Sequence, residues 1–195
     1  LGTNYNDVLR GVGAAALRGG AGNDTLIGTD FANNLQGGSG NDRLQGGKGN
    51  DELIGGAGDD VYVFSPNDGL DTITDAQGAN SLQLGAGILP GNTNANRIGD
   101  DLVLGFGGTT DRVTVKNWGS DTAARLSNVV FADGSSWSTA EVNALALLHP
   151  IGGTEYSDIL SPWAGEVAAT MMGGQGNDSY TVRVLGDTVQ EYPDE

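Results

Sequence analysis

The sequence has no cysteine, one histidine and only nine lysine and arginine residues among 195. Without thiols the chain can form neither a disulfide bond nor a thiolate metal site, and a single imidazole disfavours zinc. The formal net charge of −16 argues against nucleic acid and anionic membrane surfaces as partners, because both attract basic proteins. No apolar run approaches about 18 residues, so we expect no membrane span.

The motifs of common enzymes are also missing. The sequence contains no G-x-S-x-G elbow for a nucleophilic serine and no EF-hand loop. Lys48 follows Gly47 as in a phosphate-binding loop, but Gly49 stands where that loop needs serine or threonine. Aspartates are plentiful, yet they lie in glycine-rich stretches without an evident cleft. We therefore expect the chain not to be an enzyme.

Glycine is abundant, with 34 residues, and it is concentrated where the chain repeats itself every nine residues. Residues 19–63 read GGAGNDTLI, GTDFANNLQ, GGSGNDRLQ, GGKGNDELI and GGAGDDVYV. Glycine recurs at positions one, two and four of the unit, an acid or amide occupies position six, and position eight is apolar or aromatic. A strict short period with fixed positions predicts a stacked solenoid.

A unit of nine residues has room for a turn and a short strand with one inward side chain, which position eight supplies. Two units would then make one layer of a flattened coil, with layers about 4.8 Å apart. This arrangement stacks Leu26, Leu44 and Tyr62 in one sheet, and Leu35 and Leu53 in the facing sheet.

Position six places Asp24, Asp42 and Asp60 along one edge of the coil, and Asn33 and Asp51 along the other. Carboxylates about 5 Å apart repel each other by roughly 3 kcal/mol per pair at an effective dielectric constant near 20. A metal-free row of such acids therefore opposes its own stacking. The turn glycines leave backbone carbonyls pointing at a shared point. Such an oxygen-only set of donors favours a hard cation, and calcium tolerates irregular coordination better than magnesium.

The unit GGxGxDxUx resembles the nonapeptide of the RTX proteins, which are secreted bacterial toxins, proteases, lipases and epimerases. The resemblance implies an all-β fold, a parallel β-roll (β-solenoid), that holds several Ca²⁺ ions between turns two units apart. The implied sites lie between Asp24 and Asp42, between Asp42 and Asp60, and between Asn33 and Asp51. Asn33 should weaken its site, because an amide carries no charge. The glycines implied at these sites are Gly20, Gly22, Gly38, Gly40, Gly47, Gly49, Gly56 and Gly58.

Imperfect units precede the regular array. GTNYNDVLR, residues 2–10, resembles the variant unit GTDFANNLQ and places Asp7 at position six. Two interpretations stay open for it: a weak calcium site with Asp24, or a cation-free capping turn. The next stretch, GVGAAALR, is one residue short and has Leu17 at the apolar position and Ala15 at the acidic one.

The motif also recovers in part after the array. A two-residue insertion follows Val63, and then Gly69, Asp71 and Ile73 fit positions four, six and eight. This spacing predicts a cation between Asp51 and Asp71. Asp75 either caps this edge or is a solvated turn residue.

From residue 76 we expect the period to be lost. Apolar alternation predicts strands at 101–106, 111–118 and 126–131, and a helix at 138–148 begins with a capping box of Ser138 and Glu141. Residues 76–150 resemble the haemolysin-type calcium-binding-related domain and are interpreted as a small β-rich cap, with one helix, on a β-roll of residues 1–75. The predicted inward side chains of the helix are Val142, Leu145 and Leu148. Trp118 and Trp137 are expected in the core of the cap, with a sugar-stacking platform as the alternative.

The pattern restarts near residue 153. GTEYSDILS matches GTNYNDVLR, and GGQGNDSYT matches GGAGNDTLI. Residues 151–195 are therefore interpreted as the incomplete start of a second β-roll, with calcium-site residues Asp158, Gly174, Gly176 and Asp178.

The resulting hypothesis is a calcium-binding RTX module of a large secreted bacterial protein. The resemblance implies export by a type I secretion apparatus, followed by folding on calcium outside the cell together with the rest of the parent protein. Two alternatives remain: an adhesive or carbohydrate-binding segment, and an accessory module of a secreted enzyme.

Overall fold

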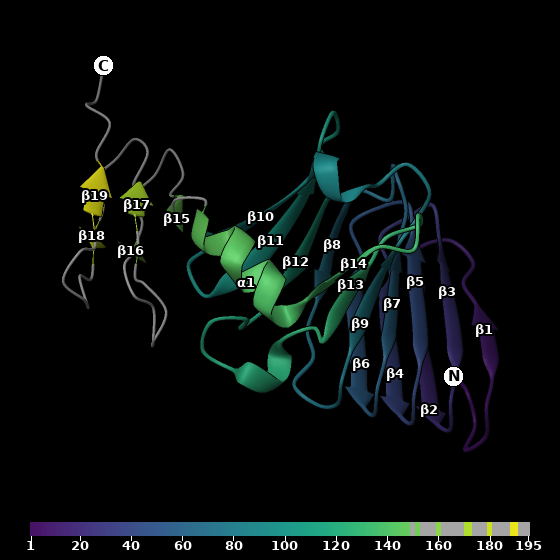
Figure 1. Ribbon diagram of the computed structural model, residues 1–195. Coiled ribbons are helices and arrows are strands. Elements are labelled where there is room, and N and C mark those ends of the chain that lie inside the picture. The colour runs from purple at the N-terminus through teal and green to yellow at the C-terminus, as the bar shows by residue number, and fades with distance from the viewer. Residues whose placement is uncertain (149–150, 153–158, 161–169, 173–178, 181–187, 191–195) are drawn as a thin grey trace.

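The computed structural model describes residues 1–148 and five short strands beyond them, at 151–152, 159–160, 170–172, 179–180 and 188–190. Residues 1–148 form two seven-stranded sheets that face each other as a flattened coil, with the helix α1 at one end (Figure 1). Consecutive strands of the array alternate between the sheets, so the chain winds as a solenoid. The predicted all-β parallel β-roll is confirmed.

The first sheet has five parallel strands from the repeats. They are β1 (Val8–Arg10), β3 (Thr25–Thr29), β5 (Arg43–Gly47), β7 (Val61–Phe64) and β9 (Ser81–Leu84). β13 (Asn128–Val130) continues them in parallel, and β14 (Ser136–Ser138) ends the sheet antiparallel.

The second sheet begins with β2 (Ala16–Ala21), β4 (Asn34–Ser39), β6 (Glu52–Ala57) and β8 (Leu70–Ile73). β12 (Arg112–Val115) pairs in parallel with β8, and the antiparallel strands β11 (Asp101–Phe106) and β10 (Thr93–Ile98) complete it.

The register follows the nine-residue period. Leu44 pairs with Leu26 on one side and with Tyr62 on the other, and Leu35 pairs with Leu53 in the facing sheet. All five side chains are buried, so each layer contributes apolar groups to a continuous core, as the sequence predicts.

The solenoid extends one unit further than expected. Leu82 pairs with Tyr62, and Gly78 and Asn80 occupy positions four and six of that unit. The expected loss of period from residue 76 is therefore wrong. Positions one and two of this unit carry no glycine and position six carries an amide, which conceals the repeat in the sequence.

The following segments add a further layer to both sheets before the strands reverse direction. Val115 pairs with Ile73, and Val129 pairs with Leu82. The predicted strands correspond to β11, β12 and β13, whereas β9, β10 and β14 were not predicted. Both sheets run without a break across residue 75, and the division of the chain into three domains stays a prediction.

The helix α1 (Thr139–Leu148) begins with the predicted capping box. The Ser138 N–H donates to Glu141 Oε2 at 2.7 Å, and the Glu141 N–H donates to Ser138 Oγ at 3.3 Å. Val142 is buried as predicted and Leu145 packs against the core, while the side chain of Leu148 lies outside the described part.

Both predicted core tryptophans pack in or against the apolar core of the cap. Trp118 is 0% exposed and donates its indole N–H to Asn143 Oδ1 at 2.8 Å. Trp137 is partly buried and lies edge-on against Phe131, with 4.8 Å between ring centroids. The core interpretation is confirmed for Trp118, whose buried ring cannot stack on a sugar.

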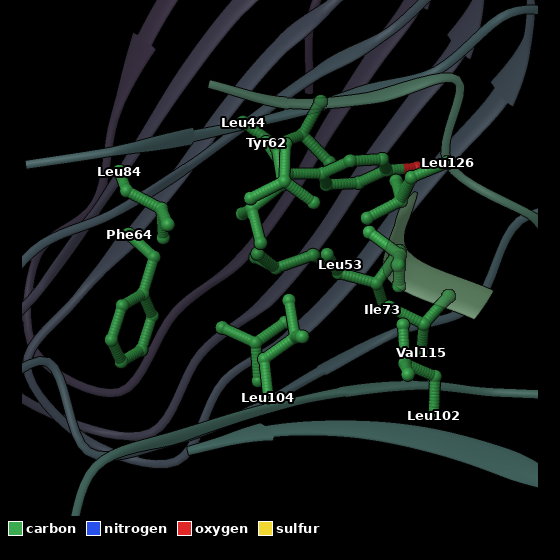
Figure 2. Packing of buried hydrophobic residues seen from close by; sticks show 14 of the residues in the cluster. Leu44, Leu53, Tyr62, Phe64, Ile73, Leu84, Leu102, Leu104, Val115 and Leu126 are labelled. Atoms are coloured by element: carbon green, nitrogen blue, oxygen red, sulfur yellow. The ribbon is translucent and has the colours of Figure 1, made fainter. Parts of the chain in front are cut away.

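A single apolar cluster joins the array to the cap. Figure 2 shows Leu44, Leu53 and Tyr62 of the repeats packed together with Leu104 and Val115 of the cap strands. The last layer of the array is thus covered by apolar side chains from residues 102–146.

Five short strands are described after residue 150, where a second array is predicted. They are β15 (Ile151–Gly152), β16 (Ile159–Leu160), β17 (Thr170–Met172), β18 (Ser179–Tyr180) and β19 (Thr188–Gln190). They pair in parallel, with Leu160 opposite Tyr180, the position-eight residues of their units. The predicted site residues Asp158, Gly174, Gly176 and Asp178 lie outside the described residues.

Candidate calcium sites

The position-six side chains form two rows along the edges of the solenoid. We call Asp7, Asp24, Asp42, Asp60 and Asn80 the first column, and Asn33, Asp51 and Asp71 the second column.

In each column, a side chain accepts a hydrogen bond from the backbone of the coil before it. The Asp24 N–H donates to Asp42 Oδ1 at 2.7 Å, and the Asp42 N–H donates to Asp60 Oδ1 at 2.7 Å. On the other edge, the Asn33 N–H donates to Asp51 Oδ1 at 2.7 Å. The structure therefore brings together the three pairs of residues that were predicted to share an ion.

The columns continue in both directions. The Asp7 N–H donates to Asp24 Oδ1 at 2.8 Å, and the Asp51 N–H donates to Asp71 Oδ1 at 3.0 Å, so both expected neighbours are in place. The Asp60 N–H donates to Asn80 Oδ1 at 2.8 Å. Sequence reasoning missed Asn80, although the Gly-x-Asn-x-Leu spacing of residues 78–82 could have revealed it.

The second carboxylate oxygens are buried and lack a hydrogen-bond partner among the described residues. They are Oδ2 of Asp24, Asp42, Asp51, Asp60 and Asp71. In the regular units each of these oxygens lies over the position-one glycine of its own unit. A Cβ on Gly19 would come within 2.1 Å of Asp24 Oδ2, and a Cβ on Gly37 within 2.2 Å of Asp42 Oδ2.

A backbone oxygen of the next coil lies at the same place. The Cβ position of Gly19 is 2.6 Å from the Gly37 carbonyl oxygen, and that of Gly37 is 2.7 Å from the Gly55 carbonyl oxygen. An unpaired carboxylate oxygen and a carbonyl oxygen therefore converge over Gly19 and over Gly37. This donor set fits a hard cation such as calcium, which takes carboxylate and carbonyl ligands.

The glycines at positions two and four permit this close stacking. Gly38 and Gly40 both have a φ of 118°. A Cβ on Gly38 would lie 2.1 Å from the Gly20 carbonyl oxygen, and a Cβ on Gly40 would lie 2.3 Å from the Gly22 carbonyl oxygen. Only glycine combines a positive φ with such an approach to the neighbouring backbone. The same two features hold at Gly20, Gly22, Gly47, Gly49, Gly56, Gly58 and Gly69.

The metal-free columns are electrostatically unfavourable. Burial, together with the neighbouring carboxylates, raises the pKa of Asp51 to about 6, of Asp60 to about 7 and of Asp71 to about 8. Burial also raises the pKa of Asp42. The backbone N–H bonds oppose these shifts but do not cancel them, so a cation between the coils would stabilise the ionised side chains.

The units with threonine at position two differ from the others. Asp7 Oδ2 accepts the Thr3 N–H at 2.6 Å and its hydroxyl at 2.8 Å, and these bonds lower the pKa of Asp7. Asn33 Oδ1 accepts the Thr29 N–H at 2.6 Å, while Asn33 Nδ2 donates to the Gly13 carbonyl at 3.2 Å. These contacts favour the cation-free interpretation of residues 2–10 and are consistent with a weakened site at Asn33.

Two absences hold for the described residues. No three histidine, cysteine, aspartate or glutamate side chains there are grouped as ligands of one metal ion. No helix in that part of the chain is long and apolar enough to cross a membrane.

The geometry thus defines a calcium-binding β-roll, and comparison with known families gives its type. The RTX calcium-binding nonapeptide repeat, in four copies, matches residues 13–30 and 27–62, and the haemolysin-type calcium binding protein related domain matches residues 101–141. No curated protein matches the chain. The chain therefore carries an RTX repeat array followed by a haemolysin-type calcium-binding-related domain, and the repeats imply a calcium-binding module.

Proposed function

We propose that this module is a calcium-dependent folding unit with no catalytic activity of its own. The observation that carries the proposal is the row of buried Oδ2 atoms without hydrogen-bond partners along both columns. Unpaired buried carboxylates are costly, so the fold is poorly stable until a cation compensates them.

The rest of the array offers little to offset that cost. Each unit contributes one inward apolar side chain, and glycine loses more conformational entropy on folding than any other residue. Calcium supplies the missing charge and binds carboxylate and carbonyl oxygens of facing turns. Binding and folding then become one equilibrium, because the ligands converge only in the folded coil.

The columns also make the sites depend on one another. Asp42 lies between Asp24 and Asp60, and Asp51 lies between Asn33 and Asp71, so each of the two middle acids serves the ions on both sides. Filling one site orders a ligand of the next. We therefore expect cooperative binding, with a midpoint in the weak extracellular range of about 10⁻⁴–10⁻³ M.

The same coupling suits a secreted protein. In a cytosol with little calcium the array stays unfolded, which is the state that a type I secretion apparatus requires, and outside the cell calcium folds it as part of the larger parent protein. The RTX repeats support this localisation, because proteins that carry them are typically secreted. The absence of cysteine agrees with calcium, rather than disulfide bonds, as the stabilising element.

Circular dichroism tests the proposal directly. The 195-residue chain should lack a β spectrum in EDTA, gain it cooperatively on titration with calcium, and gain much less with magnesium. A native β spectrum in EDTA, or equal rescue by magnesium, would contradict it.

A further inference from the structure

The first column ends in a coil that departs from the nonapeptide motif at position one. Gly19, Gly37 and Gly55 lie five residues before the acids of their units, and the corresponding residue before Asn80 is Asp75. Asp75 is 8% exposed, so the solvated interpretation of this residue is wrong.

The side chain of Asp75 reaches the point that a backbone carbonyl occupies in the regular coils. A Cβ on Gly55 would lie 2.1 Å from Asp60 Oδ2, 2.4 Å from Asp75 Oδ2 and 2.5 Å from the Tyr62 hydroxyl oxygen. At Gly37, the oxygen from the next coil is instead the Gly55 carbonyl, at 2.7 Å. Two carboxylate oxygens thus converge at this layer.

The neighbouring groups fix the orientation of Asp75. Tyr62 donates its hydroxyl to Asp75 Oδ2 and accepts the Gly55 N–H at 2.9 Å, while the Gln77 N–H donates to Asp75 Oδ1 at 3.1 Å. The ring of Tyr62 is part of the apolar core and carries its oxygen on the side toward Leu126 (Figure 2). The carboxylate is therefore held in place by a tyrosine that the fold itself buries.

Asp60 provides the second, independent observation. Its side chain is 1% exposed, and its Oδ2 has no hydrogen-bond partner among the described residues although it points to the same place as Asp75. In the described part of the chain, no lysine or arginine forms an ion pair with either acid. Two buried carboxylates that face each other in this way need a cation or a shared proton between them.

We propose that Asp75 and Asp60 together bind a calcium ion that closes the first column, at a site that the nonapeptide motif does not encode. The inference rests on the proposed function, because it takes calcium as the ion of the columns. Asp75 supplies the negative charge that the amide Asn80 does not bring to this layer, so the site has two carboxylates like those between Asp24 and Asp60. It also joins the last coil of the array to the residues that lead into the cap.

Calorimetric calcium titration of the full chain tests the proposal with three variants. Asp75→Asn keeps the shape of the side chain and should remove one ion per chain, or weaken its binding at least tenfold. Asp75→Gly places at position one the residue that the other coils have there, so it should fold even if Asp75→Asn does not. It should lose the same ion. Asp133→Asn, a matched change at an exposed turn, should leave the titration unchanged.

Terbium luminescence gives a second readout. Tyr62 lies beside the site and should sensitise Tb³⁺ bound there, so Tyr62→Phe should reduce the emission. Because the Tyr62 hydroxyl orients Asp75, this variant should also weaken the binding of that ion. Asp75→Asn should reduce the same emission. Unchanged calcium stoichiometry and affinity in folded Asp75→Asn or Asp75→Gly would overturn the inference and would indicate a shared proton. If the unmodified chain binds no calcium at all, the proposed function fails first.

Discussion

Asp42 is the position at which the columns can be tested most sharply. Its Oδ1 accepts the Asp24 N–H, its own N–H donates to Asp60, and its Oδ2 has no partner in the described part of the chain. Replacement by asparagine keeps the Oδ1 acceptor but removes the charge. Replacement by alanine removes both, and it leaves the Asp24 N–H without an acceptor.

The two substitutions should therefore differ in a defined way. Both should lower the number of bound calcium ions by up to two, because Asp42 contributes to the sites on either side. Asp42→Ala should destabilise the calcium-bound protein by about 1–3 kcal/mol more than Asp42→Asn, the cost of one unsatisfied buried donor. In EDTA, Asp42→Asn should instead make the folded state more stable than in the unmodified chain. Burial raises the pKa of Asp42, so without metal its negative charge destabilises the folded state.

Calorimetric titration counts the ions, and equilibrium unfolding in calcium and in EDTA measures the free energies. Asp7→Asn is the matched control, because Thr3 already satisfies Asp7 within its own coil. Equal loss of ions in Asp7→Asn and Asp42→Asn, or the same destabilisation with and without calcium, would refute the layered arrangement of the sites.

Burial and packing lead to four further predictions. Acidification from pH 8 to pH 5 should weaken calcium binding in titrations, because Asp60 and Asp71, with pKa values of about 7 and 8, then take up protons. In EDTA, acid should instead stabilise the folded state in melting experiments. The folded-state pKa values of Asp60 and Asp71 lie above the unfolded value of about 3.9. The free energy of unfolding should therefore rise as the pH falls from about 8 toward 4, and this gain should be lost as the pH rises again. Gly38→Ala should prevent the calcium-induced β spectrum in circular dichroism, because the new Cβ would lie 2.1 Å from the Gly20 oxygen at a φ of 118°. Deletion of residues 76–148 should uncover the last layer of the core, so calcium should now induce aggregation or dye binding in light scattering and fluorescence assays, and an unchanged calcium midpoint would contradict a capping role.

The regular part of the fold could be predicted because its period fixes the register. With units of constant length, the residue opposite Leu44 has to be Leu26 or Tyr62, and no other alignment keeps the glycines at the turns. The same constancy places the acids in columns, so the pairs of position-six residues followed from spacing alone.

The parts that were not predicted lack the sequence pattern that usually marks their structure. β10 has Ala95 and Arg97 on its buried side, and a charged residue at a core position hides the alternation that marks a strand. The sequence left two roles open for Asp75, because its neighbours Gly55 and Tyr62 are distant in sequence and meet it only in the folded coil.

The hydrogen bonds of the columns all run in one direction along the solenoid, from the backbone of an earlier coil to the side chain of the next. Each coil therefore has two unlike faces, one that presents N–H donors and one that presents carboxylates. Two arrays that met through equal faces would place acids against acids or donors against donors. End-to-end association of uncapped arrays of this kind would be head-to-tail, and a head-to-tail contact repeated without closure builds a filament rather than a closed dimer. In this chain the cap covers the last layer of the array and so prevents that repetition.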